Sequence, residues 1–114
     1  MALSSPESDP AKYFGFKDLH GFKDFVGYVF LCAPDEFPYT DWRDPDDQMN
    51  LDRAFAGLRY GLDLAASEKG ENEVVMRCRQ LVDDALEYFH AGDHSAGRRA
   101  LNEIRNLLKR LPSR

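Results

Sequence analysis

The sequence predicts an all-α protein: one domain in which four helices pack as antiparallel neighbours, with a long acidic loop between the first two. Apolar residues recur every three or four positions along four segments, as in amphipathic helices. No run alternates apolar and polar residues over the length of a strand. The 114 residues suit one domain. We expect a flexible N-terminal lead-in over 1–12, rich in proline and serine, followed by a single helical domain over 13–114.

The first helix is expected over about 18–33, because its apolar residues fall on one face. That face consists of Phe22, Phe25, Val26, Val29 and Phe30. Pro34 follows and disfavours further helix. Gly21 and Gly27 each weaken a helix by about 1 kcal/mol relative to alanine. Their presence suggests that another part of the backbone comes close at both positions.

The second helix is expected over about 45–68. Asp44 is a suitable N-cap and Pro45 suits the first helical position. The apolar face consists of Leu51, Phe55, Leu58, Leu62 and Ala65. Gly57 and Gly61 are four residues apart and therefore share a face. We expect the first helix to pack closely there; a contact between two copies of the chain is the alternative.

The third and fourth helices are expected over about 73–90 and 94–110. Asn72 and Asp93 are the predicted N-caps, and Gly70 and Gly92 are placed to end the preceding helices. The connections at 69–72 and 91–93 are short, which favours antiparallel neighbours.

This last pair of helices resembles a single tetratricopeptide-repeat hairpin. The resemblance rests on Ala85, Tyr88, the Gly92-Asp93 turn and Gly97. Ile104 stands where that repeat usually has alanine, and no second copy precedes the hairpin. The resemblance therefore implies a helical hairpin and no family membership.

The charge of the chain is concentrated in one segment. The net charge is −5, and residues 35–53, with seven acidic and two basic residues, account for all of it. Direct binding to nucleic acid or to an anionic membrane needs a basic face, so we expect neither. No apolar run approaches the ~20 residues of a membrane-spanning helix, and no signal peptide is visible. Only two cysteines, Cys32 and Cys78, are present. This fits a reducing, cytoplasmic location.

The candidate partner-binding residues lie on the acidic loop, residues 34–47. They are Asp35, Glu36, Phe37, Tyr39, Asp41, Trp42, Asp44, Asp46 and Asp47. In one interpretation the aromatic rings tuck under the loop, as a lid on the helices, while the carboxylates face solvent. In the other, the rings are anchors and the carboxylates pair with a basic partner. Both interpretations can hold together.

No pattern in the chain predicts a metal site, a cofactor or a catalytic centre. Asp44, Asp46 and Asp47 begin like a calcium loop, but Met49 and Phe55 occupy the positions that need glycine and glutamate. His90 and His94 are separated by a glycine turn, which argues against a zinc pair. Phosphate-binding loops and hydrolase motifs are absent from the sequence. We therefore expect a protein that is not an enzyme.

The function that these features favour is a small acidic inhibitor that binds another protein. The specific form that we expect is a bacterial immunity or antitoxin-type protein, which plugs the anion-binding active site of a basic toxin. Its carboxylates would take the place of substrate phosphates. One alternative is a non-enzymatic helical adaptor or transcription-associated regulator that uses the hairpin over 73–110. Another is a homodimeric structural bundle.

Overall fold

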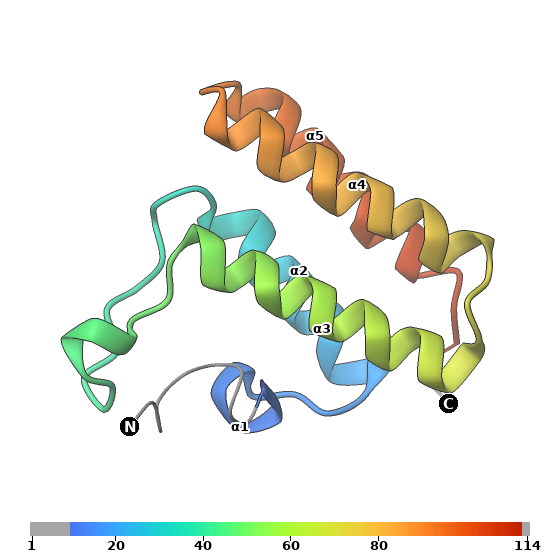
Figure 1. Ribbon diagram of the computed structural model, residues 1–114, viewed down its shortest axis with the longest axis horizontal. Coiled ribbons are helices and arrows are strands. Elements are labelled where there is room, and N and C mark those ends of the chain that lie inside the picture. The colour runs from blue at the N-terminus through green and yellow to red at the C-terminus, as the bar shows by residue number, and fades with distance from the viewer. Residues whose placement is uncertain (1–9, 113–114) are drawn as a thin grey trace.

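The computed structural model describes residues 10–112 and contains five α-helices, one short 3-10 helix and, within that range, no strand (Figure 1). The all-α prediction is confirmed. The elements are α1 (Pro10–Phe14), α2 (Leu19–Cys32), η1 (Pro45–Asp47), α3 (Leu51–Lys69), α4 (Glu73–His90) and α5 (His94–Leu108). Of the lead-in expected over 1–12, residues 1–9 lie outside the described residues and the rest belong to α1.

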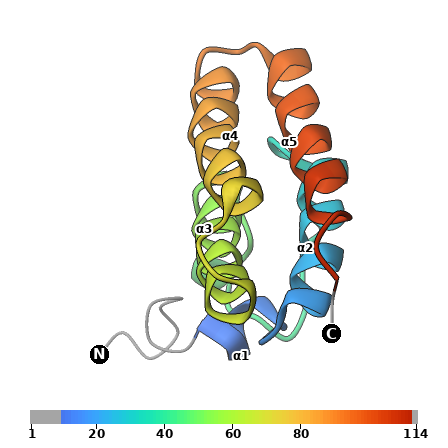
Figure 2. The same ribbon diagram turned by 90° about the vertical axis from the view of Figure 1, so that its right-hand side faces the viewer.

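The four long helices pack in a closed cycle of contacts. The α4–α5 hairpin has the most extensive contact, α3 packs on both α4 and α2, and α2 packs on α5. Figure 2 shows α3 and α4 on one side of the molecule and α2 and α5 on the other. The short α1 contacts α3. No helix within residues 10–112 has both the length and the apolar character needed to cross a bilayer.

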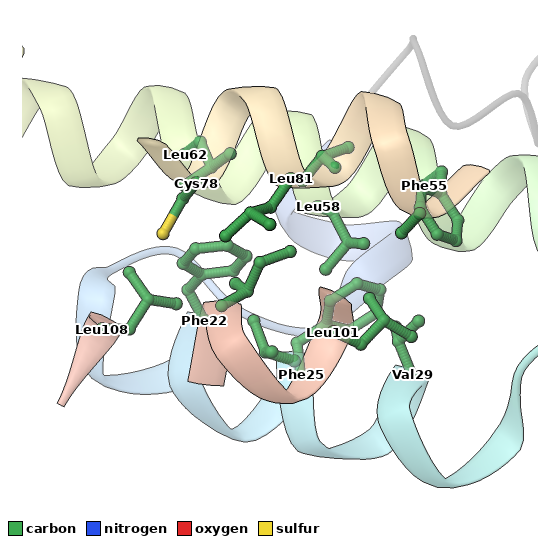
Figure 3. Close-up of a cluster of buried hydrophobic side chains, with 14 of the residues drawn as sticks. Phe22, Phe25, Val29, Phe55, Leu58, Leu62, Cys78, Leu81, Leu101 and Leu108 are labelled. Atoms are coloured by element: carbon green, nitrogen blue, oxygen red, sulfur yellow. The ribbon is translucent and has the colours of Figure 1, made fainter. Parts of the chain in front are cut away.

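The core fills the space between these four helices. Phe22 of α2, Leu58 and Leu62 of α3, Cys78 of α4 and Leu101 of α5 are fully buried in one cluster (Figure 3). No polar or charged residue of the described chain is buried with them. Burial of apolar surface from all four helices is the main term that stabilises the fold.

Close packing at the paired glycines is confirmed. A β-carbon at position 57 would lie 2.6 Å from the Phe25 ring, and one at position 61 would collide with the Phe22 ring. The rings of α2 therefore cover both glycines. The expectation for Gly27 is wrong, because nothing lies within 4 Å of a β-carbon there. At Gly21 the close neighbour is Phe16, from the segment just before α2.

Two of the predicted N-caps are confirmed. The Asn72 side chain accepts a hydrogen bond from the Val75 amide, and the Asp93 side chain accepts one from the Ala96 amide. The hairpin between α4 and α5 closes tightly, since a β-carbon at Gly97 would lie 2.7 Å from the Phe89 ring.

The predicted start of the second helix is wrong. The α-helix begins at Leu51, and Asn50 caps it by accepting a hydrogen bond from the Arg53 amide at 2.9 Å. Pro45–Asp47 form only a separate 3-10 turn, and Asp44 makes no capping side-chain bond. The backbone at Gln48 is extended, with ψ of 152°, and so separates the two helices.

Candidate partner-binding site

The acidic loop, residues 34–47, joins α2 to α3 and projects from one end of the molecule (Figure 1). Its aromatic residues divide into two groups. The Phe37 ring is partly buried and lies 5.7 Å from the ring of Tyr28, measured between centroids. Tyr39 and Trp42 are 65% and 78% exposed. Phe37 thus packs against α2, whereas the side chains of Tyr39 and Trp42 lie at the surface.

The carboxylates of the loop also form two groups, one partly buried and one exposed. Asp47 has a side chain only 15% exposed and lies 3.9 Å from Arg53, so it serves the fold. The others are exposed and form no ion pair with any described residue: Asp35, Glu36, Asp41, Asp44 and Asp46. Removing the favourable hydration of an exposed carboxylate costs free energy unless a cation replaces it. Covering any of these five groups is therefore favourable only where a cation replaces the lost hydration.

Gln48 holds the loop in shape, which the sequence did not predict. Its Oε1 accepts a hydrogen bond from the Thr40 amide at 2.7 Å. Its Nε2 donates to the carbonyl oxygens of Thr40 at 2.8 Å, of Arg43 at 3.0 Å and of Asp44 at 3.3 Å. One amide side chain thus binds main-chain groups on the facing part of the loop. Arg53 in turn donates to the Gln48 carbonyl at 2.8 Å.

Tyr13 of α1 and Arg43 join the loop to the helical body. The Arg43 guanidinium lies 4.1 Å from the centroid of the Tyr13 ring and 4.9 Å from that of the Trp42 ring, both cation–π distances. It also donates to the Tyr13 carbonyl at 2.6 Å. The Tyr13 hydroxyl donates to the Asp47 carbonyl at 2.8 Å. Trp42 is therefore exposed and yet held by a neighbour.

A pocket of about 370 Å³ lies between α1, α2 and the loop. Its walls are mainly aromatic, from Phe14, Phe16, Phe25 and Tyr28, and Asp24 and Arg43 add charges of opposite sign. Burial raises the pKa of the Tyr28 hydroxyl. That hydroxyl is therefore neutral at physiological pH, and the pocket presents it as a hydrogen-bonding group.

The thiols of the chain are poorly suited to nucleophilic chemistry. Burial raises the pKa of the Cys78 thiol to about 12. Burial, followed by the nearby Glu36 carboxylate, also raises the pKa of the Cys32 thiol. Both remain protonated at neutral pH, whereas the thiolate is the reactive form. Over residues 10–112, no three side chains of His, Cys, Asp or Glu are grouped so as to hold a metal ion.

Comparison with known proteins found no matching family model, no matching curated protein and no matching solved structure.

Proposed function

We propose that this chain is a small acidic inhibitor that binds a basic protein through the acidic loop. The observation that carries the proposal is the exposed pair Tyr39 and Trp42, which lie among five carboxylates that have no ionic partner within residues 10–112. Exposed aromatic side chains are frequent binding hot spots, and complementary charge increases both specificity and the rate of association.

The way in which the loop is held supports this function. Ordering a loop on binding costs free energy, and a loop already held in shape avoids much of that cost. The four hydrogen bonds of the Gln48 amide and the stacking of Arg43 on Trp42 provide such order before a partner arrives.

The specific inhibitor that we propose is of the bacterial immunity or antitoxin type, acting in the cytoplasm. A toxin that acts on nucleic acids or nucleotides needs a basic cleft for phosphates. Carboxylates at Asp41, Asp44 and Asp46 can occupy such a cleft in place of phosphates, while Trp42 fills an apolar part of the interface. Blocking of that cleft is the inhibitory step.

A homodimer that uses Gly57 and Gly61 as its contact does not fit this fold, because the rings of Phe25 and Phe22 cover these glycines. The helical adaptor would instead use the α4–α5 hairpin, where Tyr88 is 42% exposed beside the exposed Glu87. This pair provides a matched control, since each site places one exposed aromatic ring next to one carboxylate.

The test compares the wild-type chain with two double variants, Asp41→Asn with Trp42→Ala and Glu87→Gln with Tyr88→Ala. Each tagged protein captures partners from a lysate of its own cells. The partner is then purified, and both its affinity and the inhibition of its own activity are measured. We expect a basic partner that the wild type and the Glu87/Tyr88 variant inhibit. Loss of a hot spot of about 2 kcal/mol should weaken binding of the Asp41/Trp42 variant about thirtyfold.

Circular dichroism first establishes that both variants keep the helical content of the wild type. Equal affinity of all three proteins for the partner would rule out the acidic loop as the binding surface. If only the Glu87/Tyr88 variant loses the partner, the adaptor that uses the α4–α5 hairpin replaces the inhibitor proposed here.

A further inference from the structure

The ion pairs of the protein are unevenly distributed among its helices. Arg59 lies 3.1 Å from Asp83, Arg79 lies 3.0 Å from Asp63, and both pairs join α3 to α4. Arg77 of α4 forms an ion pair at 3.3 Å with Glu103, the acidic residue within α5. The cations on α5 and directly after it are left without a carboxylate partner among the described residues: Arg98, Arg99, Arg105, Lys109 and Arg110.

Three cations line the contact between α2 and α5 and are held there by neutral groups. Arg98 donates to the Ala33 carbonyl at 3.4 Å. The Arg105 guanidinium lies 5.0 Å from the centroid of the Phe30 ring. Lys23 of α2 donates to the Leu111 carbonyl at 2.6 Å. A carbonyl or a ring orients a cation without cancelling its charge, so this contact remains positive.

Lys23, Arg105 and Lys109 come together around a small pocket of about 90 Å³, whose apolar floor is formed by Val26 and Leu108. Asp24, the nearest carboxylate to Lys23 in sequence, lines the different pocket between α1, α2 and the acidic loop. Among the described residues, the small pocket is therefore lined by three positive charges and no negative one. Like charges gathered in this way repel one another, and a bound anion relieves that repulsion.

We propose that this pocket, lined by Lys23, Arg105 and Lys109, binds a phosphoryl group. Ammonium and guanidinium groups are the usual protein partners of phosphate oxygens, and hydrogen bonds between charged groups are about twice as strong as neutral ones. A volume of about 90 Å³ has room for several waters, and hence for one tetrahedral oxyanion. It is smaller than the ~300 Å³ or more of pockets that enclose a drug-sized ligand.

Only the phosphoryl group itself would enter the pocket, and it can come from free phosphate or from the end of a larger phosphate monoester. The site lies on α2 and α5, away from the acidic loop, and does not depend on the function proposed for that loop.

The test is a titration of the nitrogen-15-labelled protein with inorganic phosphate and, separately, with phenyl phosphate, at constant ionic strength set with sodium chloride. Amide chemical shifts report binding. We expect saturable shifts centred on residues 23–26 and 105–109. Lys109→Gln should weaken the affinity about tenfold, the change expected for one charge-assisted hydrogen bond.

The matched control is Arg110→Gln, because Arg110 is the next exposed cation and does not line the pocket. It should change the affinity less than twofold. Similar binding of both probes would assign the site to phosphate monoesters as well as to the free ion. Binding of inorganic phosphate alone would restrict it to the free ion. Shifts that do not saturate, or equal weakening by Lys109→Gln and Arg110→Gln, would overturn the proposal.

Discussion

The ring of Phe22 lies against the backbone of Gly61, in the space that a β-carbon at position 61 would need. Phe22 is fully buried on α2, and Gly61 lies midway along α3. The absence of a side chain at position 61 therefore lets α2 and α3 approach closely enough for the ring to be covered.

This relationship predicts opposite effects for two substitutions of glycine by alanine. Gly61→Ala should lower the free energy of unfolding by about 2–3 kcal/mol, because the added methyl group overpacks the core against a ring. Gly27→Ala should raise it by about 0.5–1 kcal/mol, because nothing lies near that position and alanine favours a helix. Urea unfolding followed by circular dichroism measures both changes. Equal effects of the two substitutions would show that helix propensity, and not the contact with Phe22, determines the result.

The start of α3 predicts a second pair of effects. Asn50→Ala should cost about 1 kcal/mol of stability, because the Arg53 amide loses its capping acceptor. Asp44→Ala should cost almost nothing, since the Asp44 side chain forms no capping hydrogen bond. Thermal unfolding of the two variants separates these expectations. A larger loss for Asp44→Ala would place the true start of the helix near residue 45.

Gln48 is expected to stabilise the acidic loop and to have little effect on the helices. Gln48→Ala removes all four of its hydrogen bonds to the loop backbone. Gln48→Glu, when ionised, keeps an acceptor for the Thr40 amide but loses all three donated bonds. Hydrogen exchange of the Thr40 amide should become about tenfold faster in the alanine variant. This change corresponds to the loss of ~1.4 kcal/mol of local stability. The exchange rate of this amide in the glutamate variant should lie between those of the wild type and the alanine variant.

In both Gln48 variants, the exchange of amides inside α4 and α5 should stay as in the wild type. Faster exchange throughout the chain would mean that Gln48 supports the whole fold.

The buried thiol of Cys78 makes stability depend on pH in the alkaline range. The thiol has a pKa near 9.0 when unperturbed and of about 12 in the folded protein. Between these values the unfolded chain binds fewer protons than the folded one, so stability falls as pH rises; below pH 9 this group adds almost no slope.

The free energy of unfolding can change by at most about 1.4 kcal/mol per pH unit for one titrating group. Between pH 8 and pH 10, the free energy of unfolding of the wild type should therefore fall by roughly 1 kcal/mol more than that of Cys78→Ala. Urea unfolding at the two pH values measures this difference. Other groups that titrate in this range are the same in both proteins and cancel. Parallel losses in the two proteins would show that Cys78 is accessible to water in the folded state.

Much of the fold could be predicted because local signals and tertiary packing agree. The apolar periodicity of α2, α4 and α5, and the caps at Asn72 and Asp93, are short-range features that the structure keeps. The start of α3 could not be predicted in the same way. Asp44 and Pro45 are good local signals for a helix start, but Gln48 binds the backbone of Thr40 and Arg43. These contacts within the loop outweigh the signals for a helix start.

The residue types of the candidate site could be predicted from the sequence, whereas their arrangement in space could not. The sequence placed acidic and aromatic residues together on the loop, and it left open which rings are buried. Phe37 reaches Tyr28, whereas Trp42 is held by Arg43 at the surface. Tyr13, Gln48 and Arg53 were missed, because the side chain of each binds a main-chain carbonyl or amide several or many positions away. Periodicity and charge counts carry no information about such contacts.

The tight hairpin of α4 and α5 has a consequence for how the chain folds. A turn of three residues, 91–93, brings the two helices together, so their contact costs little loop-closure entropy. The contact of α2 with α5 joins segments near opposite ends of the described chain, so its formation closes a long loop. We therefore expect the hairpin to be formed in the folding transition state, with α2 docking later. In stopped-flow measurements, Leu101→Ala should then mainly slow folding, whereas Val29→Ala should mainly accelerate unfolding.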